Sequence, residues 1–185
     1  LGVDQRGSPM IMPRGQQLLL PANPLFVLTT LLLALLVNML INISMVGNAA
    51  WTPDFLAVTL VFWCIHQPRL VGIGVAFFFG VASDVHQATL MGQHALTYTA
   101  LGFFSLMIHR RLLWFTVPSQ AMQVLPLFLT AHALELTVRM ASGALFPGWS
   151  LFLAPLLEAA LWPIMSVILL APQRRAPNPD AHRPL

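Results

Sequence analysis

Charged side chains are absent from Gly15 to Pro53, and this stretch constrains the fold more than any other feature of the chain. Within it, Leu25–Val46 is a run of 22 mostly apolar residues. A helix of that length spans a bilayer core of about 30 Å. The run is also longer than the apolar core of a signal peptide, which has about 7–15 residues. The sequence therefore predicts a first transmembrane helix.

The composition extends this conclusion to the whole chain of 185 residues. Hydrophobic residues make up 57% and charged residues 8%, whereas a soluble domain carries about 25% charged residues. Arginines outnumber acids by nine to six, but they lie between apolar runs. Their expected partner is therefore the membrane surface rather than nucleic acid. The single cysteine, Cys64, cannot form an internal disulfide. We expect one integral membrane domain.

Two short apolar runs, Phe55–Ile65 and Leu70–Ala82, are joined by the polar hinge His66-Gln67-Pro68-Arg69. With its flanks, each run gives a helix of about 25 Å, enough to cross a bilayer that thins locally. Asp54 and Asp84 mark the outer ends of the pair. We therefore predict a tight transmembrane hairpin with its carboxylates on one side of the membrane and Arg69 on the other.

The second helix of this hairpin carries a stripe of small residues. Gly72, Ala76, Gly80 and Asp84 follow one another at four-residue spacing, so they share one helix face. Small residues in such a stripe let a second helix approach closely within lipid. The simpler alternative is ordinary packing, with Asp84 among the lipid headgroups. Gly92, eight residues later in a polar connection, favours a more specific role for Asp84.

A set of motifs in this region resembles the rod shape-determining protein MreD family. The resemblance is strongest over Pro53–Arg111 and weaker at Leu161-Trp162-Pro163, and it is carried by Pro53-Asp54, Phe62-Trp63, Pro68-Arg69, Gly74, Gly80, Asp84 and Gly92. Together with the stripe of small residues, which contributes Ala76, it implies a set of partner-binding or structural residues. These are Asp54, Trp63, Pro68, Arg69, Gly74, Ala76, Gly80, Asp84, Gly92, Trp162 and Pro163.

The apolar runs predict an all-α membrane protein with six transmembrane helices in one bundle, over residues 13–172. Residues 1–12 read as a cloning remnant or native start, and the basic, proline-rich residues 173–185 as a disordered cytoplasmic tail. The resemblance implies a fold similar to the substrate-binding components of energy-coupling factor transporters. The predicted helices lie near residues 25–46, 53–66, 70–84, 93–108, 117–141 and 151–170.

The arginines alternate between connections, and this predicts the orientation of the bundle. They lie before the first helix and after the second, fourth and sixth, with Arg139 as the exception. Since positive residues favour the cytoplasmic side, both termini are expected in the cytoplasm of the bacterial inner membrane. A re-entrant hairpin would bury Arg69 at mid-membrane, at a cost of about 2.5–3.5 kcal/mol. Six crossings are therefore the better interpretation.

The same topology gathers ionisable residues in the outer half of the membrane, where their cost makes them functional candidates. Glu135 and Arg139 have the four-residue spacing of an ion pair, which we expect to form. The simpler alternative is that helix ends reach water at the headgroups. That alternative suits Asp54 and Asp84 better than Glu135 and Glu158. The expected outer polar pocket contains His94, Tyr98, His132, Glu135, Arg139 and Glu158.

Enzymatic motifs are not found in the sequence. It contains neither an HExxH zinc signature nor a GxSxG elbow. A metal site formed by Asp84, His86 and His94 would need loop folding that the sequence does not dictate, so neither a metal nor a cofactor is expected. The chain is predicted not to be an enzyme.

Two functions remain open. The resemblance implies a membrane scaffold of the cell-wall elongation machinery. This scaffold would bind an MreC-like bitopic partner and act, less directly, with the MreB filament and a RodA/class B penicillin-binding protein synthase. The alternative is a membrane subunit that binds a small molecule or lipid in its outer polar pocket. Co-purification of a single-span partner would favour the first function, and a tightly bound ligand would favour the second.

Overall fold

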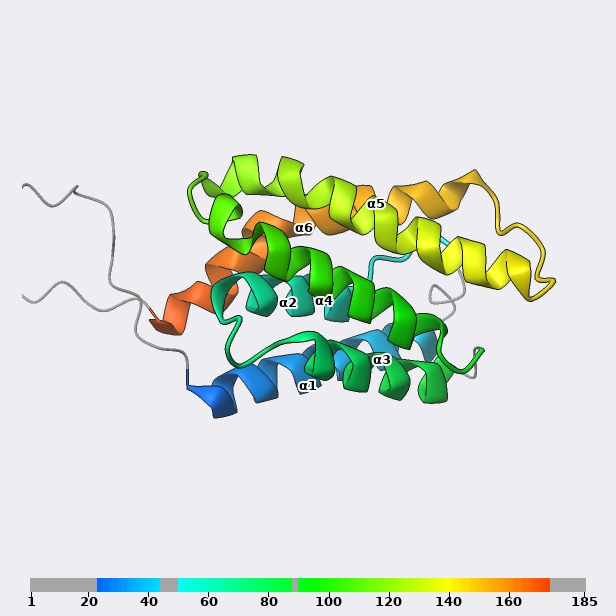
Figure 1. Cartoon of the computed structure of the whole chain (residues 1–185), viewed down its shortest axis with the longest axis horizontal. Coiled ribbons are helices and arrows are strands. Elements are labelled where there is room, and N and C mark those ends of the chain that lie inside the picture. Colours follow the sequence, from blue (N-terminus) through cyan, green and yellow to red (C-terminus); the bar gives the residue numbers. More distant parts are fainter. Residues whose placement is uncertain (1–22, 44–49, 88–89, 174–185) are drawn as a thin grey trace, which may run out of the picture.

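The computed structural model describes residues 23–43, 50–87 and 90–173, and within these ranges all regular secondary structure is helical. Successive helices run in opposite directions, so Pro24 and Gln173 lie at the same end of the bundle (Figure 1). Short 3₁₀ turns, η1 (Trp149–Phe152) and η2 (Ala171–Gln173), flank the last helix. The helices are α1 (Pro24–Ile43), α2 (Phe55–His66), α3 (Ile73–Gln87), α4 (Gln93–Leu112), α5 (Val117–Ala141) and α6 (Leu153–Leu170).

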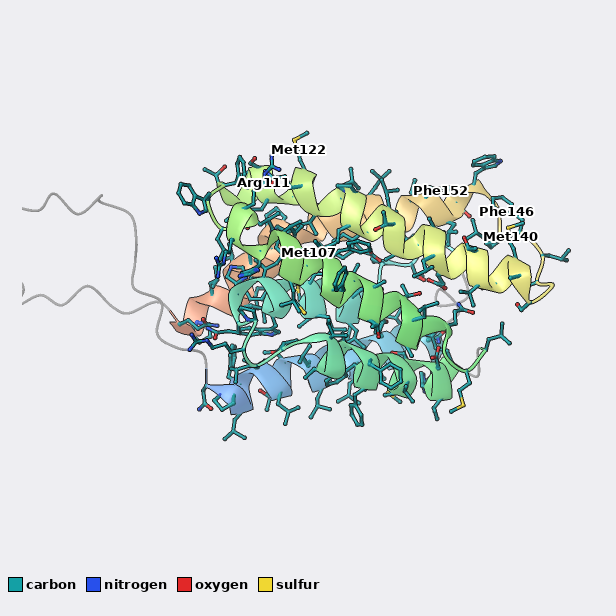
Figure 2. All side chains as sticks on the ribbon, in the orientation of Figure 1. Met107, Arg111, Met122, Met140, Phe146 and Phe152 are labelled. Carbon is teal, nitrogen blue, oxygen red and sulfur yellow. The ribbon has the colours of Figure 1, made fainter. Side chains whose placement is uncertain are left out.

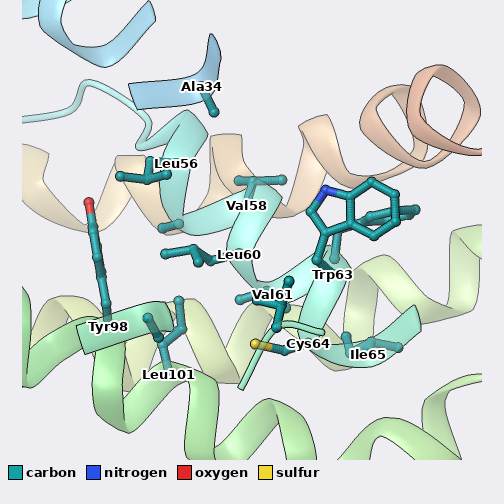
Figure 3. Packing of buried hydrophobic residues seen from close by; sticks show 14 of the residues in the cluster. Ala34, Leu56, Val58, Leu60, Val61, Trp63, Cys64, Ile65, Tyr98 and Leu101 are labelled. Atoms are coloured by element: carbon teal, nitrogen blue, oxygen red, sulfur yellow. The ribbon is translucent and has the colours of Figure 1, made fainter. Parts of the chain in front are cut away.

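Helix α2 forms the centre of the bundle. Ten consecutive residues, Leu56–Ile65, are buried, and α2 packs against α1, α4 and α6. Figure 3 shows side chains pointing to different sides of the helix, for example those of Leu60 and Trp63. The side chain of Asp54 caps the helix by accepting a hydrogen bond from the Ala57 N–H. The helix ends at His66, because Pro68 disfavours helical geometry in the residue before it, Gln67.

The outer surface of the bundle is apolar. On α1, Leu25, Leu33 and Leu40 are each more than half exposed, as are Met107 on α4 and Met122 on α5, which Figure 2 labels. Such a surface suits lipid, not water. Three segments are long and apolar enough to cross a membrane, namely Pro24–Ile43, Val117–Ala141 and Trp149–Gln173. The protein is therefore an integral membrane protein.

The remaining helices differ in length from the predicted spans. Helix α2 has 12 residues and α3 has 15, about 18 and 22 Å. Helix α3 begins at Ile73 instead of residue 70, because the hinge continues as a turn in which Val71 N–H bonds to the Gln67 carbonyl. Helix α4 continues past residue 108 through Arg110 and Arg111. Residues 1–12, residues 44–46 of the first predicted helix, and the tail from residue 174 lie outside the described residues.

Candidate functional site

The described acidic residues gather at one end of the bundle. Asp54 precedes α2, Asp84 lies in the last turn of α3, Glu135 lies late in α5, and Glu158 lies in the second turn of α6. The helix directions bring these positions together, away from Arg69, Arg110 and Arg111. In Figure 2, Arg111 lies at one end of the bundle, whereas Met140 and Phe146 lie at the other, acidic end.

A pocket of about 1000 Å³ opens at this acidic end. Its walls come from α1, the segment before α2, the start of α4, the end of α5 and the connection that follows α5. Four of the six residues predicted for the outer polar pocket line it. Tyr98 and Glu158 do not line the pocket. Both are hydrogen-bonded to Asp54, which does line it. The polar and aromatic lining residues are Asn38, Asn42, Trp51, Thr52, Asp54, Gln87, Gln93, His94, His132, Glu135, Arg139, Ser142 and Ser150.

Asp54 joins four helices. Its Oδ1 accepts hydrogen bonds from the Asn38 amide on α1 and from the Ala57 N–H, and its Oδ2 accepts one from the Tyr98 hydroxyl on α4. The Asp54 N–H donates to Glu158 Oε1 on α6 at 2.9 Å. The Asn38 side chain also accepts a hydrogen bond from Phe55 N–H at 3.0 Å. Asp54 is thus part of a partly buried hydrogen-bond network, and both of its oxygens accept hydrogen bonds there.

Glu158 is fully buried. Besides the Asp54 N–H, its Oε1 lies 3.4 Å from His132 Nε2 on α5. Its Oε2 has no hydrogen-bond partner among the described residues. The interpretation that such groups reach headgroup water at helix ends is therefore wrong for Glu158, because the helix packing encloses it.

Asp84 is also buried, with 2% of its surface exposed, instead of lying among headgroups. It caps the start of α4 from the neighbouring helix. Its carboxylate accepts backbone hydrogen bonds from Gly92, His94 and Ala95, at 2.9, 2.7 and 3.2 Å, and lies 2.9 Å from His94 Nδ1. Gly92 has φ of +104°, a backbone conformation that side chains other than that of glycine rarely adopt. Asp84 and Gly92 therefore form one structural unit, the α3–α4 connection.

The predicted close helix contact is present in part of the small-residue stripe. A Cβ on Gly80 would lie 2.5 Å from the Ala95 Cα, so α3 and α4 touch backbone to backbone there. Ala76 lies opposite Gly102 of α4, at 3.2 Å from where a Gly102 Cβ would be. Gly72 and Gly74, in contrast, have open space around them. The contact is therefore confined to the Ala76–Gly80 half of the stripe.

The expected ion pair between Glu135 and Arg139 is wrong. The described ion pairs are His94–Asp84 and His132–Glu158. Glu135 Oε1 instead accepts a hydrogen bond from Gln93 Nε2 at 3.0 Å. Gln93 begins α4 and reaches across to α5, where it occupies one of the two oxygens of this carboxylate. Sequence reasoning missed Gln93 because a glutamine at the start of a helix has no distinguishing pattern.

The two tryptophans of the motif set belong to the core. Trp63 is fully buried and its indole N–H donates to Thr30 Oγ1 at 2.9 Å, which ties α2 to α1. Trp162 is also fully buried, 3.3 Å from Gln120 Oε1, and ties α6 to α5. Pro163 lies inside α6. Pro68 and Arg69 form the hinge at the opposite end, where Arg69 is exposed.

Metal ligands are not grouped anywhere in the described part of the chain: no three His, Cys, Asp or Glu residues there could hold an ion together. His94, a candidate ligand with Asp84 and His86, has its Nδ1 2.9 Å from the Asp84 carboxylate instead.

The fold and site together define a helical integral membrane protein with an apolar outer surface, segregated charges and a polar pocket at its acidic end. The chain belongs to the MreD family, since the model for the rod shape-determining protein MreD matches residues 21–171. It is 26% identical over 128 residues to the rod shape-determining protein MreD of Haemophilus influenzae, covering 67% of this chain and 76% of that relative. No solved structure matches the chain. Membership in this family indicates a role in rod shape determination.

Proposed function

We propose that the protein is a non-enzymatic membrane scaffold of the rod-shape and peptidoglycan elongation machinery. The observation that carries this proposal is the family match over residues 21–171, which includes every described helix. An assembly role also suits the chemistry of two carboxylates, the partly buried Asp54 and the buried Asp84. Asp54 and Asp84 use both of their oxygens to hold helices together, which is what a rigid platform requires.

The proposed direct partner is an MreC-like bitopic membrane protein. The exposed apolar faces of the bundle are suitable for contact with a single membrane-spanning helix, because helices associate in lipid through close packing of such faces. The MreB filament and a RodA/class B penicillin-binding protein synthase would be reached through that partner.

The proposed topology has six crossings in the bacterial inner membrane, with both termini in the cytoplasm. It is supported by the placement of Arg69, Arg110 and Arg111 at the end where Pro24 and Gln173 lie, because cytoplasmic connections are enriched in arginine. The proposed architecture is that of the substrate-binding components of energy-coupling factor transporters. The antiparallel order of the six helices and the polar pocket at one end are compatible with it.

Binding of a small molecule or lipid is the second candidate function. The pocket of about 1000 Å³ favours it, because ligand sites in proteins occupy about 300–1000 Å³. The two functions are compatible, since the pocket lies at one end of the bundle and a partner helix would contact its side.

The test is affinity purification of the tagged protein from its own host after gentle detergent extraction. A single-span protein should co-purify, and cells depleted of the chain should lose rod shape and regain it when the wild-type gene is restored. Arg139→Gln serves as a control variant, because it changes the pocket wall and not the lateral surface. A scaffold that binds its partner through the lateral surface should still co-purify the partner and restore rod shape with this variant. Rod-shaped growth after depletion, with no single-span protein recovered, would contradict the scaffold.

A further inference from the structure

Two charged side chains of the pocket wall, Glu135 and Arg139, have hydrogen-bonding groups that no described residue of the protein uses. Asp54 lies in the wall, but both of its oxygens accept hydrogen bonds from the protein. Glu135 and Arg139, one helical turn apart on α5, also line the pocket, and both are half-buried. They are therefore the charges that a bound molecule could reach.

These two charges are held apart, although their spacing would allow them to pair. Gln93 holds Glu135 Oε1 at 3.0 Å, and no hydrogen bond to Glu135 Oε2 is recorded among the described residues. The Arg139 guanidinium likewise makes no ion pair with any described residue. Opposite charges left unpaired in a half-buried pocket are costly unless something else neutralises them.

We propose that the pocket binds a zwitterionic group. Its ammonium is placed at the Glu135 carboxylate, and its anion, a phosphate or carboxylate, at the Arg139 guanidinium. Arginine suits this role because its planar fork binds such anions through two parallel hydrogen bonds. Trp51, 41% exposed and in the same wall, offers an aromatic face to the ammonium.

A ligand with a single charge fits this arrangement less well. A simple anion would be attracted by Arg139 but repelled by Glu135, and a simple cation would meet the reverse situation. The inference rests on the binding role given above as the second function and is independent of partner assembly. The zwitterion can be the headgroup of a phospholipid or a free small molecule, and the two sources share the same recognition chemistry.

The experiment measures binding to the full-length protein in an uncharged maltoside detergent by isothermal titration calorimetry. The probes are glycerophosphoethanolamine as the zwitterion, glycerophosphoglycerol as the anion and ethanolamine as the cation. We expect the zwitterion to bind about tenfold or more tightly than either single-charge probe, because a hydrogen-bonded charge pair contributes about 1.5–3 kcal/mol. Nanodiscs of phosphatidylethanolamine and of phosphatidylglycerol, followed by native mass spectrometry, distinguish a lipid source. Retained phosphatidylethanolamine with no binding of the free probe assigns the site to lipid, and the reverse assigns it to a free molecule.

The variants separate the two charges. Arg139→Gln should weaken binding of the zwitterion about tenfold and leave binding of ethanolamine unchanged or stronger. Glu135→Gln should weaken binding of the zwitterion and leave binding of glycerophosphoglycerol unchanged or stronger. Arg110→Gln is the matched control, because it removes an exposed arginine at the opposite end of the bundle. Thermal unfolding of each unliganded variant shows whether it has folded.

Competition on the wild-type protein keeps the proposal falsifiable if a variant does not fold. If all three probes compete equally well for the pocket, the preference for a zwitterion is overturned, although the pocket still binds ligands. Absence of binding by every probe and by both lipids would overturn the binding function as well, without affecting the scaffold.

Discussion

At the scale of single residues, Gly80 is the position where the packing leaves least room. The backbone of α4 lies where its side chain would be, at 2.5 Å from the Ala95 Cα. Gly80→Ala should therefore force α3 and α4 apart and lower the stability by about 1–3 kcal/mol. The readout is the thermal unfolding midpoint of the purified protein in detergent.

Gly74→Ala is the matched control for Gly80→Ala, since it adds the same methyl group to the same helix where nothing lies within 4 Å. It should change the stability by less than about 0.5 kcal/mol. Equal midpoints for the two variants would mean that α3 and α4 do not make this contact.

Asp84 provides a second prediction at this scale. Asp84→Asn keeps the size of the side chain but replaces one acceptor oxygen by a donor, so at least one of the N–H groups of Gly92, His94 and Ala95 loses its partner. We expect a loss of about 1–3 kcal/mol. Hydrogen exchange at these amides should quicken, whereas His86→Gln on the same turn should leave exchange unchanged. Unaltered exchange in Asp84→Asn would refute the capping role.

The sequence predicted some of these residues and missed others for a physical reason. Gly80 and Ala76 could be found because the spacing of small residues along one helix is visible in the chain. Gln93 could not, because its hydrogen bond to Glu135 depends on where α4 begins relative to α5. The predicted Glu135–Arg139 pair was wrong, since spacing within one helix does not determine whether two side chains meet.

At the scale of elements, α2 differs from every other helix in being enclosed by protein. Leu60 is 1% exposed there, whereas Leu33 on α1 is 61% exposed. Leu60→Ala leaves a cavity and should cost about 2–5 kcal/mol. Leu33→Ala removes the same atoms from a surface that meets detergent, and should stay within about 0.5 kcal/mol. Unfolding midpoints of the two variants test this, and a larger loss for Leu33→Ala would place α2 at the surface.

The positions of the helices were largely predictable, but the central place of α2 was not. Apolar runs and their proline or polar boundaries mark where helices form, and Val117–Ala141 illustrates this, since its ends coincide with the predicted 117–141. An apolar run reads the same whether lipid or protein surrounds it. The choice of α2 as the centre therefore depends on packing among helices distant in sequence, such as α6.

At the scale of the whole molecule, the segregation of charge predicts the orientation in the membrane. In a Cys64→Ser background, a cysteine replacing Gln67 should react with an impermeant thiol reagent only after the cells are opened, because Gln67 lies at the arginine end. A cysteine replacing Ser142, at the acidic end, should react in intact cells. The opposite labelling pattern would invert the proposed topology.

The enclosure of α2 has a consequence for biosynthesis. Helix α2 leaves the ribosome before two of the helices that surround it, α4 and α6, and α6 is the last of the described helices to be made. At about 18 Å it is also shorter than the membrane core of about 30 Å, so the crossing proposed for it needs its flanking segments and a locally thinner bilayer. The hydrogen bonds of Asp54 are likewise complete only after Tyr98 and Glu158 have been synthesised. The centre of the molecule is therefore closed only after α6 has been made, and a chain truncated before α6 leaves its innermost helix open on one side.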